Sequence, residues 1–550
     1  MSSIIELIIY SIHIVLPFMA FLIVYYNITS MWKNFRGNGP LVVLVNKITK
    51  EKIAVNYWEN SIGRSKSCDI VLDGPTVSRD HAVMFRRDKG WFISDTNSKT
   101  GVLVNNKKIN GCEQIYIDDI INIGGVPLLF KRADVIKNDD YVRLNKRKKS
   151  MPTVTLMMAV TIFQLLASLE LCFVEGVFNY KPLIVFGLLS LIFWSYFIIS
   201  KYIFKIVNFE LETLGVFLSG IGIITLCGAD IDSTYNQIIA LALGMALFSF
   251  IIFFIKNPDR VVKFRIFIAV GAIGMLVLNL VLGTVKNGSQ NWIMLGNISI
   301  QPSEFVKVAF ILVGTSTLER LQTTKNLTEF IIFSVCCMGA LFLMGDFGTA
   351  CIFFVTFIII SFMRSGSIRT VILICSGAFI GGMMILKFKP YIMNRFSVWR
   401  HSWEHVNDMG YQQTRVMTYS ASGGLLGIGL GKGSLKHIFA STSDLVFGML
   451  CEEWGLILAI ISVLCISLIA LYGRHSSLKS RSTFYSIASC SAAGMLLFQM
   501  SLNVFGCTDI LPLTGVTLPF ISLGGSSMIS VWGMLAFIKA SDERTYAMRR

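Results

Sequence analysis

Long runs of apolar residues recur along most of the chain, and each run is long enough to cross a lipid bilayer as a helix. A helix rises about 1.5 Å per residue, so roughly 17 to 25 apolar residues cover about 30 Å of hydrocarbon. Residues 38–135 interrupt the series, because their apolar positions alternate with polar ones over short stretches. The pattern predicts thirteen spans, at residues 4–26, 152–174, 182–204, 210–228, 235–256, 263–284, 304–320, 329–344, 348–363, 370–388, 445–472, 482–507 and 516–538.

Composition agrees with a polytopic α-helical membrane protein. Of the 550 residues 54% are hydrophobic and only 15% are charged, and the mean hydropathy is +0.64. The first span, in residues 1–30, lacks a basic start and a small-residue cleavage site, so we expect a retained N-terminal anchor. The 12 cysteines fall mostly within apolar spans without a repeated ligand spacing, which argues against a metal or redox site.

Lysine and arginine gather in alternate connections between the spans, and cytoplasmic loops hold such residues. The N-terminus is therefore expected outside the cell, and residues 38–151 and the C-terminus inside. The loops expected outside are 285–303, 345–347, 389–444 and 508–515. This rule, together with a basic linker at 136–151 that suits anionic membrane lipids, explains most of the net charge of +16. No nucleic-acid partner is needed to account for it.

Short alternating segments separated by Gly, Asn and Asp predict an inserted all-β sandwich in residues 38–135. Two of its segments read GRSKSCDIVLDGPTVSRDHAVMF and DTNSKTGVLVNNKKI. They resemble the forkhead-associated (FHA) domain, which binds phosphothreonine peptides. A guanidinium and a hydroxyl that converge on a phosphate form charge-assisted hydrogen bonds, which an unmodified threonine lacks. An FHA sandwich that binds an unphosphorylated partner remains the alternative.

The FHA resemblance implies a role for each motif position. Arg64 and Ser78 would contact the phosphate, Arg79 would support the peptide, and His81 would brace the loop. Asn105 would hold the recognition loops. Thr100 stands before the turn glycine where the family usually has Asn, so the contact to the peptide backbone is expected to be weaker.

The predicted span 445–472 belongs to a stretch that carries three carboxylates, Asp444, Glu452 and Glu453. The loop before it, 389–444, is basic although the charge rule places it outside. An anionic substrate on the outer face would explain this charge, and solvated charges paired with Glu404 and Asp408 are the alternative. The basic residues in this loop are Lys389, Arg395, Arg400, Arg415, Lys432 and Lys436.

Two motif-like stretches in this loop do not carry the chemistry they suggest. The glycine-rich segment 410–434 fails the Walker spacing, because Leu426 stands at the first glycine and Gly433 at the Ser or Thr position. The pair His401 and His405 lacks the HExxH order and a third ligand, so no zinc site is predicted.

Several separated motifs resemble one family of bacterial cell-envelope proteins. They read SQNWIMLGNISIQPSEFVK, GDFGTA, GYQ with SASGGLLGIGLGKG, TSDLVFGMLCEEWG and LPLTGVTLPFISLGGSS, in this order over residues 208–540. This resembles the SEDS family, of the FtsW, RodA and SpoVE type. The resemblance implies ten core spans, with about three extra spans before them, and polymerisation of lipid II into peptidoglycan on the outer membrane face. It also implies a class B penicillin-binding transpeptidase as partner.

The same resemblance assigns site residues. Asp444 would be the catalytic carboxylate, activating the acceptor 4-hydroxyl as it attacks the anomeric carbon of the donor. Glu452, Glu453 and Asp346 would support the cavity. A divalent cation, Mg or Mn, could help to neutralise the leaving undecaprenyl pyrophosphate, but no ligand set identifies one. The residues expected to bind substrate are Arg395, Arg400, Arg415, Lys432, Lys436, Gln412, Gln301, Glu304 and Ser526.

The departures from the SEDS pattern are Asn291 for an arginine, Gly345 for a proline, and Ser443 and Leu445 on either side of Asp444. The predicted function is a peptidoglycan glycosyltransferase whose FHA domain reads a phosphothreonine protein or a Ser/Thr kinase. A lipid II flippase and an inactive scaffold are the alternatives. The predicted parts are an anchor at 1–30, the FHA domain at 38–135, a linker at 136–151, two extra spans at 152–207, the glycosyltransferase at 208–540 and a tail at 541–550.

Overall fold

The chain forms two compact units. The membrane unit consists of Met1–Trp32, Met151–Leu478 and Ile487–Arg550, and the β unit consists of Lys33–Ser150 and Lys479–Ser486. The computed structural model describes residues 2–33, 41–66, 68–87, 90–109, 111–133, 153–174, 178–203, 206, 208–286, 289–296, 298–318, 324–365, 367–388, 397–480, 482–542 and 545.

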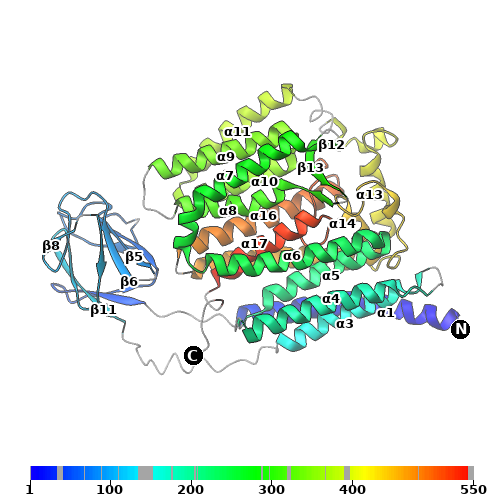
Figure 1. Cartoon of the computed structure of the whole chain (residues 1–550), viewed down its shortest axis with the longest axis horizontal. Coiled ribbons are helices and arrows are strands. Elements are labelled where there is room, and N and C mark those ends of the chain that lie inside the picture. The colour runs from blue at the N-terminus through cyan, green and yellow to red at the C-terminus, as the bar shows by residue number, and fades with distance from the viewer. Residues whose placement is uncertain are drawn as a thin grey trace. The chain divides into compact units, whose positions relative to one another are not determined.

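The β unit is a sandwich of two sheets, which confirms the all-β prediction (Figure 1). The strand order is β2-β1-β11-β10-β7-β8 in one sheet and β4-β3-β5-β6-β9 in the other. Alternate side chains, such as Leu44, Met84 and Ile123, point into a shared apolar core, as the period of two requires. The strands are β1 (Val42–Asn46), β2 (Lys52–Val55), β3 (Glu59–Gly63), β4 (Ile70–Val71), β5 (Ala82–Arg87), β6 (Gly90–Asp95), β7 (Val102–Val104), β8 (Lys107–Lys108), β9 (Cys112–Ile115), β10 (Ile120–Ile123) and β11 (Val126–Arg132).

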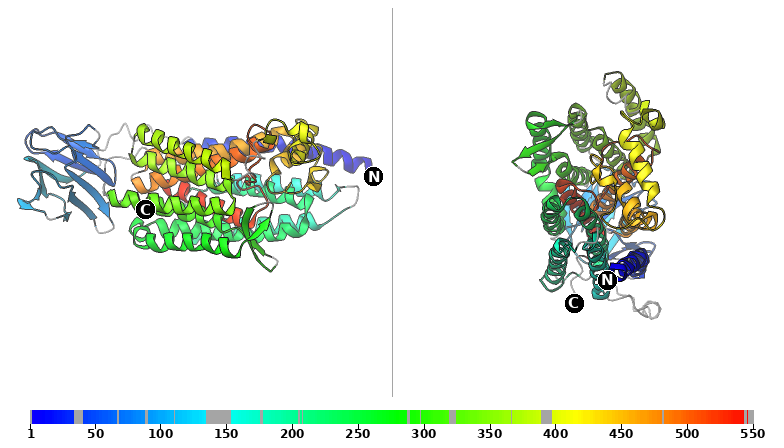
Figure 2. Two further views of the ribbon diagram at one scale, coloured as in Figure 1. Left: turned by 90° about the horizontal axis from the view of Figure 1, so that it is seen from above. Right: turned by 90° about the vertical axis from the view of Figure 1, so that its right-hand side faces the viewer.

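The membrane unit is a bundle of long apolar helices that run along a common direction (Figures 1 and 2). Each of the thirteen predicted spans overlaps a helix, and among the described residues nine helices are long and apolar enough to cross a membrane. The predicted polytopic α-helical architecture is thus confirmed. The helices are α1 (Ser2–Lys33), α3 (Thr153–Leu171), α4 (Lys181–Ile198), α5 (Glu210–Ala229), α6 (Ile231–Ile255), α7 (Pro258–Leu282), α8 (Pro302–Leu318), α9 (Thr324–Met344), α10 (Phe347–Ser365), α11 (Ile368–Phe388), α15 (Leu456–Lys479), α16 (Thr483–Cys507) and α17 (Gly525–Ser541).

Two of the predicted spans are less continuous than expected. The span 445–472 divides into α14 (Val446–Met449), a π-helical turn η5 (Leu450–Trp454) and α15, with a break at Gly455, whose φ is +85°. The last span becomes helical only at Gly525, and residues 516–524 before it are irregular. Irregular backbone at membrane depth is tolerated where it is enclosed by protein or lines a polar cavity.

One end of the bundle carries additional small elements. These are a three-stranded sheet of β12 (Thr284–Lys286), β13 (Ser289–Leu295) and β14 (Ile298–Ile300), and the short helix α13 (Tyr411–Ser422). Figure 1 shows α13 and β13 at the same end of the bundle as the start of α1. The candidate site lies among these elements.

Candidate active site

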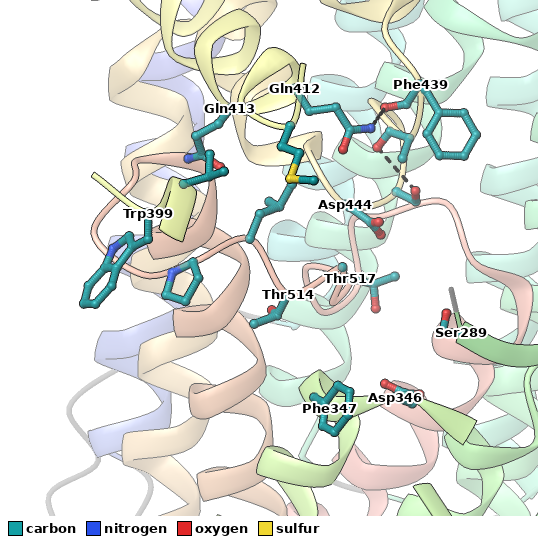
Figure 3. Close-up of a pocket in the computed structure, with 18 of the residues that line it drawn as sticks. Ser289, Asp346, Phe347, Trp399, Gln412, Gln413, Phe439, Asp444, Thr514 and Thr517 are labelled. Atoms are coloured by element: carbon teal, nitrogen blue, oxygen red, sulfur yellow. Dashed lines mark hydrogen bonds between the residues drawn. The ribbon is translucent and has the colours of Figure 1, made fainter. Parts of the chain in front are cut away.

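A cavity of about 680 Å³ opens at this end of the membrane unit (Figure 3). It gathers segments that lie far apart in the sequence, and polar side chains line much of it. The lining residues are Ser289, Trp292, Gln301, Gly345, Asp346, Phe347, Val398, Trp399, Ser402, Met409, Gln412, Gln413, Phe439, Ala440, Ser443, Asp444, Asp509, Pro512, Leu513, Thr514, Gly515, Thr517 and Leu523. Four of the predicted site residues are among them: Asp444, Gln412, Gln301 and Asp346.

Asp444 lies just before α14, and its backbone is fixed from two sides. Its N–H donates to the Ala440 carbonyl at 2.9 Å, and the Asn503 amide of α16 donates to the Asp444 carbonyl at 2.9 Å. The preceding carbonyl, of Ser443, accepts the Ser522 hydroxyl at 2.5 Å. The half-buried Asp444 carboxylate lies against Gly515, where an added Cβ would be 3.5 Å from Oδ2. The carboxylate is therefore held at the cavity wall by backbone anchors.

Asp346 reaches the cavity from the opposite side, at the turn between α9 and α10 (Figure 3). Its carboxylate accepts the Gln301 side-chain amide at 3.4 Å and the Thr349 N–H at 3.1 Å. The Gln301 N–H in turn donates to the Ser526 hydroxyl at 3.0 Å, at the start of α17. Gln301 and Asp346 thus form a polar wall across the cavity from Asp444, and Ser526 supports this wall through Gln301 without lining the cavity.

Several residues that line the cavity carry no motif in the sequence. Asp509 accepts the Ser402 hydroxyl at 3.2 Å and the Arg400 N–H at 3.4 Å. Gln413 donates to the Gly506 carbonyl at 2.5 Å and ties α13 to the end of α16. Asp509 lies two residues after the end of the predicted span 482–507, and this position was the one available signal that it lies at the membrane edge. Its partners cannot be read from the neighbouring residues.

The predicted cationic residues are distributed differently from the carboxylates. The Arg400 guanidinium lies 5.2 Å from the ring of Trp399, which lines the cavity, but Arg400 itself is not among the lining residues. Arg415 lies over the Tyr411 ring at 5.2 Å, and Lys436 donates to the Gly431 carbonyl at 2.7 Å. The side chains of Arg415, Lys432 and Lys436 do not line the cavity, and Lys389 and Arg395 lie outside the described residues.

Glu304 lies behind the cavity rather than in its lining. Its carboxylate pairs with Lys307 at 2.8 Å and accepts the Ser530 hydroxyl at 2.6 Å. Lys307 also donates to Gln499 at 3.0 Å. A buried charge is tolerated when it is paired and hydrogen-bonded, so this cluster stabilises the join between α8, α16 and α17.

Glu452 and Glu453 hold a loop rather than line the cavity. Glu452 accepts the N–H groups of Ser434 at 2.8 Å and Leu435 at 3.0 Å, and Glu453 accepts that of Gly431 at 3.1 Å. These contacts explain why two carboxylates occur in an apolar stretch. The same loop passes close to Gly455, where the helix breaks: an added Cβ at Gly455 would lie 2.3 Å from the Leu426 carbonyl carbon.

Comparison with known proteins identifies the membrane unit. The family model described as "Cell cycle protein", for FtsW, RodA and SpoVE, matches residues 203–546, which is more than half of the chain. This chain belongs to the FtsW, RodA and SpoVE family. With its apolar helices, membership of the family makes it a multi-pass bacterial membrane protein.

Individual relatives agree with this assignment. A probable peptidoglycan glycosyltransferase FtsW of Bacillus subtilis is 26% identical over 56% of this chain and 82% of its own length. The corresponding FtsW of Buchnera aphidicola is 32% identical over 51% of this chain and 71% of its own length. A chain from a solved peptidoglycan synthase complex is 24% identical, has a TM-score of 0.52 and covers 62% of this chain and 98% of that one, which shows a shared fold.

The β unit of this FtsW/RodA/SpoVE protein brings its predicted recognition residues onto neighbouring loops. The Arg64 N–H donates to the Ser78 carbonyl at 2.9 Å, and the Ser78 hydroxyl accepts the Lys99 N–H at 3.1 Å. His81 is buried and accepts the Ser78 N–H at 3.0 Å, while its other ring nitrogen lies 3.1 Å from the Gly101 carbonyl. An FHA domain model matches residues 60–124.

The other FHA positions lie around this loop pair. Arg64 and Arg79 are exposed, and the Thr100 hydroxyl donates to the Thr76 carbonyl at 3.3 Å. The Asn105 side chain donates to Asp119 at 2.8 Å and accepts the Ile120 N–H at 2.9 Å, so it fixes the turn after β7.

The residues described hold no group of three or more His, Cys, Asp or Glu side chains that could bind a metal ion. Cys68 of the β unit is buried. Burial, followed by the nearby Asp80 carboxylate, raises the pKa of the Cys68 thiol, so the thiol stays protonated near neutral pH.

Proposed function

We propose that this protein is a peptidoglycan glycosyltransferase that polymerises lipid II at the outer face of the cytoplasmic membrane. The observation that carries the proposal is the Asp444 carboxylate, held by backbone anchors in a polar-walled cavity at one end of the membrane unit. Relatives of this chain that carry the name peptidoglycan glycosyltransferase support it.

In this reaction Asp444 accepts the proton of the acceptor sugar's 4-hydroxyl while that oxygen attacks the anomeric carbon of the donor. The bond from this carbon to the pyrophosphate breaks with inversion, and undecaprenyl pyrophosphate leaves. A general base contributes about 10²- to 10⁴-fold to such a step. In this proposal Arg400, which lies beside Trp399 of the cavity lining, meets the anionic leaving group, and the polar wall of Gln301 and Asp346 orients the sugars.

The test is polymerisation of fluorescent lipid II by the purified full chain in liposomes, with glycan products resolved on a gel. The Asp444→Asn variant keeps the side-chain shape and removes the base, so we expect at least about a hundredfold loss of rate. Asp408→Asn is the matched control, because Asp408 is an exposed carboxylate of the same loop that does not line the cavity. Unchanged glycan products from Asp444→Asn would refute its assignment as the base.

We further propose that the β unit lies in the cytoplasm and recognises a phosphothreonine protein or a Ser/Thr kinase. The exposed Arg64 and Arg79, with the Ser78 hydroxyl in the same pair of loops, support phosphate binding. We also propose a class B transpeptidase as partner of the membrane unit, since a similar chain occurs in a solved peptidoglycan synthase complex that coordinates polymerization and crosslinking.

A further inference from the structure

The loop between α13 and α14 connects two sides of the cavity. Residues 423–436 of this loop follow α13, whose first turn carries Gln412 and Gln413, and lead toward Phe439 and Asp444. The Gln412 side chain donates to the Phe439 carbonyl at 3.0 Å, which joins the two sides at the cavity (Figure 3). A displacement of residues 423–436 would therefore move cavity residues at both ends.

Residues within the family-matched segment 203–546 hold this loop from one side. The carboxylates of Glu452 and Glu453 bind the loop, and so do their backbone carbonyls. The Glu452 carbonyl accepts the Ile428 N–H at 3.0 Å, and the Glu453 carbonyl accepts the Gly429 N–H at 3.2 Å. An added Cβ at Gly423 would lie 2.0 Å from the Cys451 carbonyl oxygen. The loop thus lies directly on η5, backbone against backbone.

Two helices that precede the family match hold the same loop from another side. In α1, the His13 Nε2 lies 2.7 Å from the Leu426 carbonyl oxygen, and the His13 Nδ1 lies 2.8 Å from Glu170 Oε1 of α3. The same Glu170 oxygen accepts the Leu430 N–H at 2.9 Å. His13 and Glu170 are only 6% and 3% exposed, so the network is enclosed by protein.

The glycine-rich loop also packs closely against α3 and α5 at Gly431. An added Cβ at Gly431 would lie 3.0 Å from a Leu171 methyl of α3, and one at Gly228 would lie 3.0 Å from Gly431 Cα. At the other end of α1, the Ser30 hydroxyl donates to Glu210 at 3.3 Å. Helix α1 is therefore joined to the rest of the membrane unit at both ends, and not through lipid alone.

We propose that α1 and α3 are a positioning part of the active site, in which His13 and Glu170 fix the glycine-rich loop 423–436 and through it the cavity wall that carries Gln412 and Asp444. This inference rests on the proposed polymerase function for its catalytic consequence. Neither residue touches the cavity, so both are positioning residues. The family model begins only at residue 203, so this support comes from outside the matched segment.

The experiment compares the purified full chain with Glu170→Leu, His13→Leu and Glu170→Gln in two measurements. Hydrogen–deuterium exchange of peptides covering 423–436 reports on the loop, and lipid II polymerisation gives kcat and KM. Gln164→Leu is the matched control, since Gln164 is a buried polar residue of α3 that donates to the Val216 carbonyl of α5 instead.

We expect Glu170→Leu to speed exchange in 423–436 at least about tenfold and to lower kcat by about tenfold or more with KM little changed, because small displacements of catalytic groups act mainly on the reaction step. His13→Leu should affect mainly the part around Leu426. Glu170→Gln keeps an oxygen that can accept the Leu430 N–H, so this variant should stay close to the wild type both in loop exchange and in kcat. Gln164→Leu should leave loop exchange as in the wild type.

Unchanged exchange in both Glu170→Leu and His13→Leu would overturn the proposal. So would a kcat loss in Gln164→Leu equal to that in Glu170→Leu, because α3 would then act only through general stability. A wild-type protein that forms no glycan would refute the proposed function, while the exchange measurement would still decide whether α1 and α3 hold the loop.

Discussion

The carboxyl groups of Asp444, Glu452 and Glu453 lie in one short stretch of sequence, but they meet different surroundings. Glu452 and Glu453 accept backbone N–H groups of the loop 423–436, whereas Asp444 lines the cavity beside Gly515. A carboxylate whose oxygens bind backbone amides stabilises a conformation. At the residue scale, this difference separates the proposed base from the supporting groups.

Removal of the Glu452 carboxylate should destabilise the membrane unit more than it changes substrate binding. Glu452→Ala leaves the buried N–H group of Leu435 and the part-buried N–H group of Ser434 without their acceptor, and a buried group without an acceptor costs about 1–3 kcal/mol. We expect a loss of about 3 kcal/mol in the free energy of unfolding, measured as a lower Tm in detergent. The control Glu404→Ala removes an exposed carboxylate and should change stability by less than about 1 kcal/mol. Equal Tm values for the two variants would contradict this role.

At the scale of elements, the break in the span 445–472 is a property of Gly455. Its φ of +85° lies in the left-handed region, and an added Cβ would meet the backbone of Leu426 at 2.3 Å. We expect Gly455→Ala to lower the free energy of unfolding by about 2 kcal/mol or more, measured as a lower Tm in detergent. Gly271→Ala is the matched control, because Gly271 lies inside α7 with no atom within 4 Å of an added Cβ, and alanine should be neutral or slightly stabilising there. A Gly455→Ala protein as stable as the control would show that this backbone can relax.

Helix α17 is enclosed by other helices and carries a buried lysine. Lys539 pairs with Glu212 of α5 at 2.7 Å, and both are at most 2% exposed. Lys539→Met leaves Glu212 as an unpaired buried carboxylate, so we expect a loss of about 3–5 kcal/mol. The double variant Lys539→Met with Glu212→Gln removes both charges and should recover at least half of that loss, as measured by Tm in the same detergent. A double variant less stable than the single one would exclude desolvation of Glu212 as the cause.

The sequence predicted the spans well, because hydropathy over about 20 residues depends on each segment's own composition. It could not predict the break at Gly455, since the apolar run continues through it. It placed Asp444 and Gln412 in one site through motif resemblance, but it missed Asp509, whose partners come from residues about a hundred positions away in the chain. The contacts of His13 and Glu170 were unpredictable for the same reason, because they depend on how helices pack.

At the scale of the whole molecule, the chain joins two units that match separate families. The family model for FtsW, RodA and SpoVE covers residues 203–546, and the FHA model covers residues 60–124. Each unit has its own apolar core and its own candidate site. The proposed functions can therefore be tested in the same purified chain with separate substrates.

Phosphopeptide binding should depend on Arg64 and on the charge of the phosphate. We expect Arg64→Ala to weaken binding of a phosphothreonine peptide to the full chain by at least about tenfold, because a charge-assisted hydrogen bond contributes about 1.5–3 kcal/mol. Lys66→Ala, which removes an exposed charge two residues away, should change affinity by less than about threefold. Binding should also weaken as pH falls below about 6, where the phosphate loses its second negative charge. Isothermal titration calorimetry of each variant with the phosphorylated and unphosphorylated peptide measures both effects, and equal affinity for the two peptides would favour an FHA sandwich that binds an unphosphorylated partner.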